Sequence, residues 1–296
     1  MHVINVISSR KMKEIFKKVA THSTIVVLFI LFFASQKVLA QDQEFGFMVG
    51  ASNYHGDLAY NIVPGESHAA GGVHYRHNFN PHWSWRPSLM YGKVSGSDAN
   101  FAEHKLRNLS FETDIWELST IFEYNFLPFG SRTLSKNFTT YVMSGLSVYR
   151  FEPKANFNGN LVSLRNLRTE GQTAKEQYNL IQLAIPFGIG AKYNLSKNWV
   201  LGLEVGWRKL FTDYIDDVST VYPDLQELRD NAGDLAADLS DRSWEVEGVG
   251  EPLSLPGDLR GDPELKDYFF FTTFNVSYRL TPISCWPQYR KAHLFR

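Results

Sequence analysis

The sequence has little of the chemistry on which most metal-binding and catalytic folds depend. It contains one cysteine, Cys285, which excludes an internal disulfide framework and a cysteine-based metal cluster. Beyond the N-terminal segment, no apolar run approaches the length of about twenty residues that a membrane-spanning helix needs. The formal net charge is −1 and no basic patch stands out, so nothing indicates a nucleic-acid partner.

The N-terminal segment has the layout of an export signal. Five basic side chains precede an apolar run from Ile25 to Ala34, and Ala40 stands at the expected cleavage point. A basic start, an apolar segment of about ten residues and a small residue before the cut describe a signal peptide. We therefore expect residues 1–40 to be removed on export, with Met1 or Met12 as the true start.

The mature chain alternates apolar and polar residues in about eight stretches. In the clearest, Trp199 to Arg208, one face is apolar with tryptophan at both ends, and the other carries glycine and charge. A period of two predicts a strand, and this combination of faces is more typical of a membrane barrel than of a soluble sheet. The aromatic content of 15% agrees with rings lining both membrane interfaces. The predicted strands are 44–52, 70–79, 83–94, 111–126, 138–151, 180–195, 199–208 and 268–280.

The connections between these strands alternate in length. Those after the second, fourth and sixth strands are short, whereas the others are long and polar. Short periplasmic turns and long outer loops are the outer-membrane arrangement. We therefore predict an all-β fold, an eight-stranded antiparallel transmembrane β-barrel over residues 41–280. Its long loops would be extracellular, both termini periplasmic, and residues 281–296 a periplasmic C-terminal tail.

The inward faces of the predicted strands carry many charges. An eight-stranded barrel has an interior just wide enough to be filled by its own side chains, so an open pore is not expected. Opposite charges should pair across the lumen, because an unpaired buried charge is costly. We favour a structural plug, and a proton or ion path is the alternative hypothesis. The predicted lumenal charges are Arg76, Arg86, Glu117, Glu123, Lys192, Glu204, Arg208 and Arg279.

No catalytic, cofactor or metal site is predicted. Asp213, Asp216 and Asp217 could bind calcium through oxygen ligands, but their spacing matches no calcium loop, and a solvated acidic loop is the favoured interpretation. His74 and Ser88 could both face the lumen, as a hydrolase would require, but no G-x-S-x-G signature accompanies them.

The tail after the last predicted strand has a composition suited to partner binding. Aromatic residues and arginine are favoured at interfaces, and a cysteine in an oxidising compartment can form an intermolecular disulfide. A frayed end is equally compatible with this composition. The candidate partner-binding residues are Cys285, Trp286, Tyr289 and Arg290.

Several motifs occur in order along the mature chain: Gly50 to Tyr54 with Gly56 to Leu58, Tyr75-Arg76 with Asn78 to Asn80, Arg107 to Phe111 with Ile115 to Leu118, Ile185 to Gly188, and Trp207-Arg208 with Phe211 to Ser219. With them the chain resembles the PorG-like outer-membrane β-barrels of Bacteroidota (the DUF6089 family), a component of the type IX secretion system. The resemblance covers nearly the whole mature chain. It is weakest in the loop segments 152–176 and 220–266 and in the tail.

The resemblance implies an accessory, non-enzymatic role in protein export and gliding motility, with a PorK-like ring lipoprotein and a PorN-like ring protein as partners. Our first hypothesis is therefore an outer-membrane anchor for a periplasmic ring. The second is a surface barrel whose long loops bind a ligand or mediate adhesion. The third is an enzyme that acts on lipid at the outer rim.

Overall fold

The computed structural model describes residues 43–130, 136–173, 175–264 and 266–280. Several predictions lie outside the described residues: the signal peptide 1–40 with its two candidate start residues, and the tail 281–296 with Cys285, Trp286, Tyr289 and Arg290.

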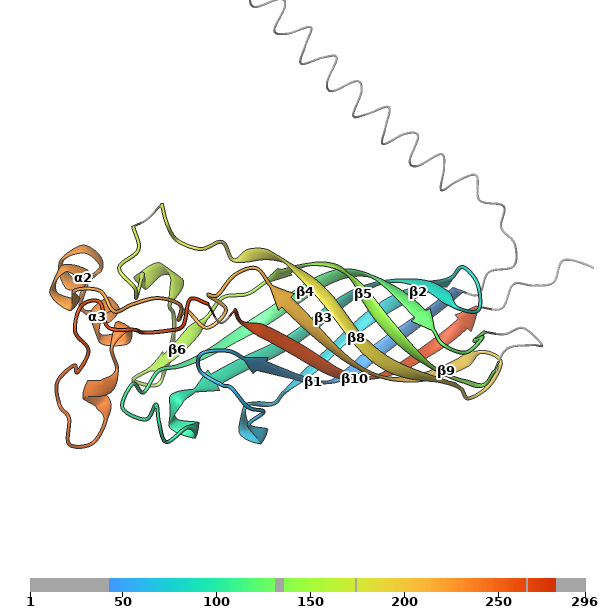
Figure 1. Ribbon diagram of the computed structural model, residues 1–296, viewed down its shortest axis with the longest axis horizontal. Coiled ribbons are helices and arrows are strands. Elements are labelled where there is room, and N and C mark those ends of the chain that lie inside the picture. Colours follow the sequence, from blue (N-terminus) through green and yellow to red (C-terminus); the bar gives the residue numbers. More distant parts are fainter. Residues whose placement is uncertain (1–42, 131–135, 174, 265, 281–296) are drawn as a thin grey trace, which may run out of the picture. The chain divides into compact units, whose positions relative to one another are not determined.

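Eight long strands of the described chain close into an antiparallel barrel (Figure 1). These strands are β1 (Gln43–His55), β2 (His68–Asn78), β3 (Trp83–Ser97), β4 (Ser110–Asn125), β5 (Phe138–Arg150), β8 (Ile181–Asn194), β9 (Trp199–Leu210) and β10 (Tyr268–Leu280). Successive long strands pair with one another, and β10 returns to pair with β1, from Leu280 opposite Gln43 to Tyr268 opposite His55. The predicted eight-stranded antiparallel β-barrel is confirmed.

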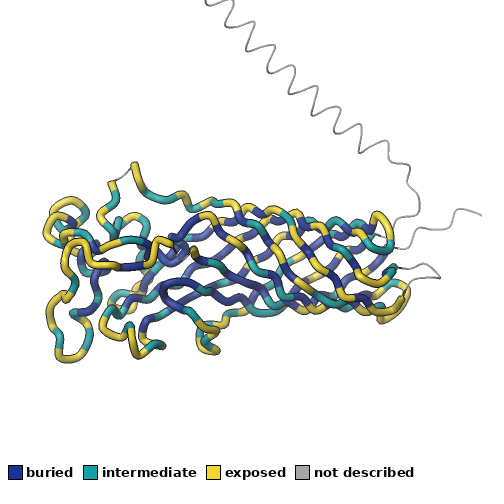
Figure 2. The backbone as a smooth tube through the Cα atoms, viewed as in Figure 1, coloured by how far each residue is buried: buried dark blue, intermediate teal, exposed yellow. Residues whose placement is uncertain are grey.

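The outward face of the barrel is apolar on all eight strands. Side chains alternate between the two faces of a strand, and Figure 2 shows exposed and buried residues alternating along the barrel wall. Phe47 is 72% exposed and Leu203 57% exposed. An apolar surface of this extent marks contact with a membrane or a partner. We call it the apolar belt, formed by Phe45, Phe47, Val49, Val73, Trp83, Leu89, Tyr91, Trp116, Leu118, Phe122, Phe138, Val142, Leu146, Val148, Ile181, Leu183, Phe187, Ile189, Tyr193, Trp199, Leu203, Phe274, Tyr278 and Leu280.

Aromatic pairs stand at both ends of the apolar belt. At the short-turn end, the ring centroids of Trp83 and Tyr124 are 5.0 Å apart. At the long-loop end, those of Tyr91 and Trp116 are 4.9 Å apart. Trp and Tyr are enriched at both membrane interfaces, because their rings combine an apolar body with a polar group. The belt and its aromatic ends therefore form the surface of a membrane-spanning barrel.

The facing of β5 could not be decided from the sequence. In the structure, Tyr141 and Met143 point into the barrel, whereas Val142 and Leu146 are exposed on the outside. Both faces carry apolar side chains, which removes the contrast that a period-two pattern needs. The lumen beside β5 is therefore lined by an apolar sulfur and a phenol as well as by charge.

The four long loops contain structure of their own. β6 (Lys154–Phe157) and β7 (Asn160–Ser163) form a hairpin that sequence analysis missed, although Asn158-Gly159 between them is a strong hairpin signal. The fourth loop contains two short helices, which are separated at Gly233, whose φ of 92° favours glycine. The remaining elements are α2 (Leu225–Ala232), α3 (Asp234–Ser240) and the 3₁₀ turns η1 (Pro64–Glu66), η2 (Asp98–Asn100), η3 (Arg165–Leu167) and η4 (Ser243–Glu245).

None of the described helices is long and apolar enough to cross a membrane.

The apolar core lies at the long-loop end of the barrel. Inward side chains such as Tyr149 and Phe269 belong to one buried cluster with loop residues such as Leu58 and Ile215. We call the described residues of the four long loops, 56–67, 98–109, 151–180 and 211–267, the loop cap. Because lumenal and loop side chains share one core, the loop cap is packed onto the barrel and not loosely attached to it.

Candidate functional site: the barrel lumen and the loop cap

The eight charges predicted to face the lumen all lie inside the barrel, and each is at most 4% exposed. They come from six different strands, so their contacts run across the lumen and not along one strand. Burying so many charges is tolerable only if each finds a partner of opposite sign. The ion pairs below show how the structure pairs them.

Glu123 is the centre of the lumenal network. Its carboxylate lies 2.9 Å from Nε of Arg76 and 2.6 Å from Nε of Arg86, and it also forms an ion pair with Lys192. Arg86 continues to Glu204 at 2.7 Å, where the hydroxyl of Tyr141 donates a second hydrogen bond of 2.6 Å. One carboxylate therefore balances three cations on three other strands.

Two members of this network were missed by sequence analysis. Glu44 accepts from Arg76 at 2.6 Å and from Arg279 at 2.9 Å, which makes it the anionic partner of both. The signal was present, because the alternation of side chains along the strand puts Glu44 on the face opposite the apolar Phe45 and Phe47. Tyr141 was missed because the facing of its strand was undecided.

A second ion pair lies nearer the loops. Arg208 donates to both oxygens of Glu117, each at 2.9 Å, and its guanidinium lies 4.5 Å from the ring centroid of Phe271. A bidentate pair of this kind is strong and directional. The lumen thus passes from the charged network at the short-turn end through this pair to the apolar core under the loop cap.

The three neighbouring aspartates of the fourth loop are buried, so the interpretation as a solvated acidic loop is wrong for them. The hydroxyls of Thr169 and Tyr178 donate to Asp217 at 2.5 and 2.6 Å. The hydroxyl of Tyr54 donates to Asp216 at 2.6 Å. The third, Asp213, accepts from a serine hydroxyl at 2.8 Å. These carboxylates hold the loops together by hydrogen bonds. Within the described ranges, no group of three or more metal-ligating side chains is arranged to hold an ion.

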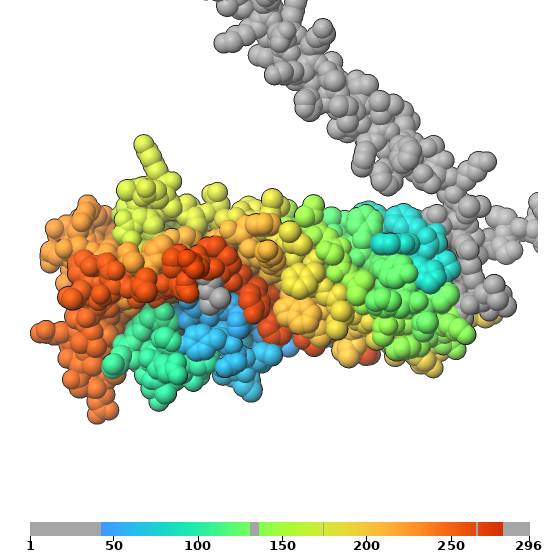
Figure 3. Space-filling model, viewed as in Figure 1, coloured from blue at the N-terminus to red at the C-terminus, as the bar shows by residue number. Residues whose placement is uncertain are grey.

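Two arginines join all four loops of the loop cap. Arg107, on the second loop, pairs with Asp98 at 2.7 Å and donates to the backbone oxygens of Asp57 at 2.8 Å and Arg260 at 2.7 Å. Arg260, on the fourth loop, pairs with Glu170 of the third loop at 3.2 Å. It also donates a hydrogen bond to the backbone oxygen of Asp217 in its own loop. Figure 3 shows the fourth loop, in orange, over this end of the molecule.

Burial of the loop carboxyls alters their ionisation. It raises the pKa of Asp217 to about 6, although Arg260 acts in the opposite direction. It also raises the pKa of Asp216 and of Asp267 well above the ordinary value, and neighbouring carboxylates add to the effect, although the hydrogen bonds to the hydroxyl of Tyr54 act in the opposite direction. The inner part of the loop cap therefore carries less negative charge than its sequence implies.

Replacing Arg260 with glutamine is expected to open the loop cap while the barrel stays folded. The buried carboxylate of Glu170 would lose its cation, which costs about 3–5 kcal/mol. Limited proteolysis of the full chain in detergent should then cleave the loops at least about 100-fold faster. Arg229→Gln is the control, because its ion pairs with Asp234 and Asp238 are at the surface and worth about 0–1 kcal/mol. Equal cleavage of both variants would contradict the structural role of Arg260.

His74 and Ser88 each have a different partner. Nε2 of His74 lies 3.0 Å from the hydroxyl of Ser277, and the hydroxyl of Ser88 lies 2.7 Å from that of Ser119. All four side chains are buried in the barrel. The register of β2 and β3 places His74 opposite Ser88, but the hydrogen bonds recorded for these two side chains go to Ser277 and Ser119 and not to each other, as a catalytic pair would require.

A family model described as "Domain of unknown function (DUF6089)" matches residues 22–239 of this chain. Among solved structures, the chain is similar to Ail, the attachment invasion locus protein of Yersinia pestis. The two are 10% identical, the match covers 82% of this chain and 100% of Ail, and the TM-score is 0.40. Neisserial surface protein A is 8% identical over 81% of this chain and 97% of its own, with a TM-score of 0.39. Outer membrane protein W of E. coli is 13% identical over 80% and 97%, with a TM-score of 0.32. No curated protein matches the chain.

Proposed function

We propose that this chain, which belongs to the DUF6089 family, is an outer-membrane anchor for a periplasmic lipoprotein ring of the type IX secretion and gliding machinery. The observation that carries the proposal is the filled lumen. Ion pairs and the apolar core occupy the interior from the short turns to the loop cap. A barrel whose interior is occupied by its own side chains is a poor conduit, so its role lies in its surfaces.

The outer membrane is the compartment that suits this surface. The apolar belt with aromatic residues at both ends is the pattern of outer-membrane barrels. Gln43 and Leu280, the two ends of the barrel, are paired at the end that carries the short turns. In the outer-membrane arrangement this end faces the periplasm, and the loop cap is extracellular.

The periplasmic face is where a ring would bind. It comprises the short turns, such as 79–82 and 195–198, together with the tail 281–296. The resemblance to PorG-like barrels implies a PorK-like lipoprotein and a PorN-like protein as the ring partners. In the tail, Cys285 is the candidate for an intermolecular disulfide, beside the candidate contact residues Trp286, Tyr289 and Arg290.

Affinity purification of the tagged protein from its native outer membrane tests the anchor function. We expect a ring lipoprotein, identified by its mass, to be recovered with the full chain and lost when residues 281–296 are deleted. A band lost only under thiol reductant, and lost equally in Cys285→Ser, would assign the contact to that cysteine. The matched control is Arg260→Gln, which alters the opposite end of the barrel. Recovery of the barrel alone in mild detergent, with export intact after the tail deletion, would contradict the anchor function.

A specific observation favours a second function, ligand binding or adhesion through the loop cap. The fourth loop is folded and packed, yet its surface has ten exposed acidic residues and, among its described residues, one exposed basic residue, Lys266. Deleting the outer part of this loop, residues 244–253, should abolish ligand binding or adhesion under this alternative. Under the anchor proposal, the same deletion should leave recovery of the ring lipoprotein intact. The exposed acidic residues are Asp224, Glu227, Asp230, Asp234, Glu245, Glu247, Glu251, Asp258, Asp262 and Glu264.

We also propose that the barrel has no enzymatic activity, with no catalytic residue and no cofactor. The proposal is supported by the hydrogen bonds of His74 and Ser88, which lie opposite each other on β2 and β3 but are bonded to Ser277 and Ser119. Loss of a measured lipid-modifying activity in His74→Ala or Ser88→Ala would overturn it.

A further inference from the structure

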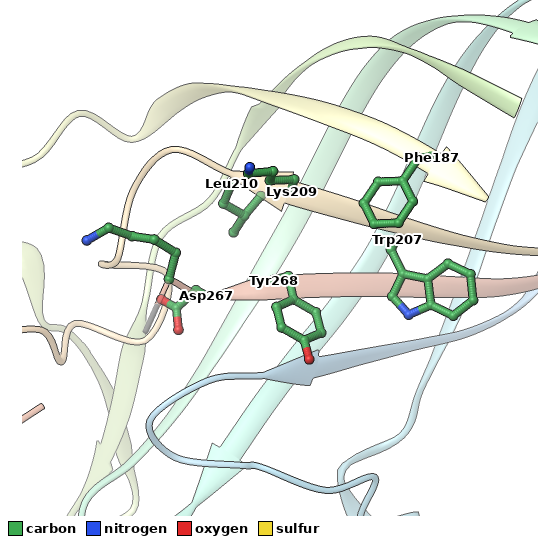
Figure 4. Close-up of a pocket in the computed structure, with 7 residues that line it drawn as sticks. Phe187, Trp207, Lys209, Leu210, Asp267 and Tyr268 are labelled. Atoms are coloured by element: carbon green, nitrogen blue, oxygen red, sulfur yellow. The ribbon is translucent and has the colours of Figure 1, made fainter. Parts of the chain in front are cut away.

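A groove of about 460 Å³ opens on the outward face of the barrel, at the edge of the apolar belt nearest the loop cap. It lies over β8, β9 and β10, and the close-up shows its aromatic side chains beside its basic ones (Figure 4). The neighbouring apolar belt would face lipid, so this groove lies where acyl chains meet headgroups. The lining residues are Phe187, Trp207, Lys209, Leu210, Lys266, Asp267 and Tyr268.

The part of the groove nearer the membrane centre is aromatic. Phe187 and Trp207 are opposite each other in the register of β8 and β9. Their rings are nearly parallel, with an interplanar angle of 20° and centroids 6.0 Å apart. Tyr268 completes the wall and stacks on His55 with a centroid distance of 4.4 Å. Flat apolar rings of this kind are a suitable surface for a hydrocarbon chain.

The part nearer the loop cap is basic. Lys209 is opposite Tyr268 in the register of β9 and β10, one outward position beyond Trp207. Lys266 is 51% exposed, and its ammonium group donates to the backbone oxygen of Pro263 at 2.7 Å and lies 3.7 Å from Asp213. Two ammonium groups therefore stand directly beyond the aromatic wall. Such side chains lay their methylene stems along apolar surface and hold their charge in the polar layer.

Asp267, the acidic residue in the lining, would not repel an anionic ligand in the groove. The carboxylate of Asp267 is 1% exposed and turned to the interior, where it lies 2.8 Å from the hydroxyl of Tyr54 and accepts from the backbone N–H of Ile215 at 3.2 Å. Burial and the neighbouring Asp216 raise the pKa of this carboxyl well above its ordinary value. The charge that the groove presents to a ligand is therefore positive.

The outward basic residues at this edge other than Lys209 have acidic neighbours. Lys93 pairs with Glu112 at 2.8 Å, Arg150 lies 3.7 Å from Glu152, and Lys266 lies 3.7 Å from the buried Asp213. For Lys209, the described part of the chain records no acidic partner within ion-pair distance. An unbalanced ammonium beside an apolar groove distinguishes this position from the rest of the edge.

We propose that this groove binds a phosphate-bearing acyl lipid of the outer leaflet, with an acyl chain along Phe187 and Trp207 and a phosphate on Lys209 and Lys266. The proposal rests on the outer-membrane placement above but not on the secretion role. Lipid phosphate is available as a phosphorylated glycolipid or as a phospholipid, and the shared chemistry is an anionic oxygen cluster joined to hydrocarbon. Binding would fix the rim of β9 and β10 where the fourth loop leaves and re-enters the barrel.

The test is titration of the folded full-length barrel with defined lipids in detergent, with bound lipid counted by native mass spectrometry. Each ammonium near the membrane surface contributes about 1 kcal/mol to anionic lipid binding, so the variant with both Lys209→Gln and Lys266→Gln should bind about 30-fold more weakly. Trp207→Ala should also weaken binding. Lys93→Gln is the matched control, since it removes a balanced lysine from the same edge, and it should bind like the unaltered protein.

The choice of probes separates the sources of phosphate. A bisphosphorylated acyl glycolipid, its dephosphorylated form, phosphatidylglycerol and inorganic phosphate are compared. Tight binding of either phosphorylated lipid, with weak binding of the dephosphorylated form, supports the proposal and identifies the source. Equal binding of the phosphorylated and dephosphorylated glycolipids, or equal loss in the Lys93→Gln control, overturns it. Competition by inorganic phosphate at the lipid concentration also overturns it, because the acyl chain would then contribute nothing.

Failure of this proposal is distinguishable from failure of the anchor function. The same variants are purified for ring recovery, and folding is verified by their altered mobility before and after heating on a denaturing gel. Lipid binding without ring recovery leaves the groove assignment intact and contradicts the anchor. Ring recovery with unchanged lipid binding in the double variant contradicts the groove assignment alone.

Discussion

Glu123→Gln is expected to destabilise the barrel by about 3–5 kcal/mol, because it removes the buried carboxylate that pairs with three cations. The change keeps the shape of the side chain and removes one negative charge. Arg76 and Arg86 would retain Glu44 and Glu204 as partners, but Lys192 would lose its carboxylate and keep the amide oxygen of Asn125, at 3.1 Å, and the ring of Tyr141, at 4.2 Å. Urea unfolding of the purified barrel in detergent, followed by tryptophan fluorescence, measures the decrease in the free energy of unfolding.

Glu112→Gln is the matched control for this substitution. It lies on the same strand, β4, and its ion pair with Lys93 has a comparable length of 2.8 Å, but both side chains are about one-third exposed. Exposed ion pairs contribute about 0–1 kcal/mol. If the two variants unfold at the same urea concentration, the lumenal network is not what stabilises the barrel interior.

Leu203→Arg is expected to cost about 2–4 kcal/mol and to hinder insertion into lipid. Leu203 points outward midway between Trp199 and Trp207, which places it near the middle of the apolar belt. An exposed position normally tolerates a charge, so a large penalty arises only if hydrocarbon surrounds it. The test is the yield of folded barrel in vesicles of defined lipid, measured from the different gel mobilities of the folded and unfolded forms.

Leu255→Arg separates lipid from exposure alone. Leu255 is 68% exposed, against 57% for Leu203, but it lies in the loop cap. A change at the surface of a loop in water should alter stability by no more than about 0.5 kcal/mol. Equal folding yields for the two arginine variants would show that the outer face of the barrel is not in contact with lipid.

The barrel could be predicted because its information is local. A period of two sets which side chains of a strand share a face, and the alternation of short and long connections sets how strands follow one another. The DUF6089 resemblance, carried by motifs such as Arg107 to Phe111 and Phe211 to Ser219, is confirmed by the family match. These two motifs supply Arg107 and Asp217, which tie the loop cap together.

The contacts within the lumen and the loop cap could not be predicted, because they depend on register and on long sequence separations. Arg279 meets Glu44 across 235 residues, and Arg260 meets Glu170 across 90. The alternation of side chains along a strand shows that a charge points into the barrel. It does not show which opposite charge lies nearby, because that depends on the stagger of the strands around the barrel. The acidic fourth loop was misjudged for the same reason, because the partners of Asp217 lie on the third loop.

The filled lumen is tested most directly by the ion conductance of the purified barrel in lipid vesicles, after its insertion has been verified by gel mobility. With the interior occupied by the Glu123 network and the apolar core, we predict no steady conductance above that of empty vesicles. Glu112→Gln should behave in the same way. A stable, unitary conductance from the unaltered barrel would contradict the filled lumen and remove the main support for an anchoring role.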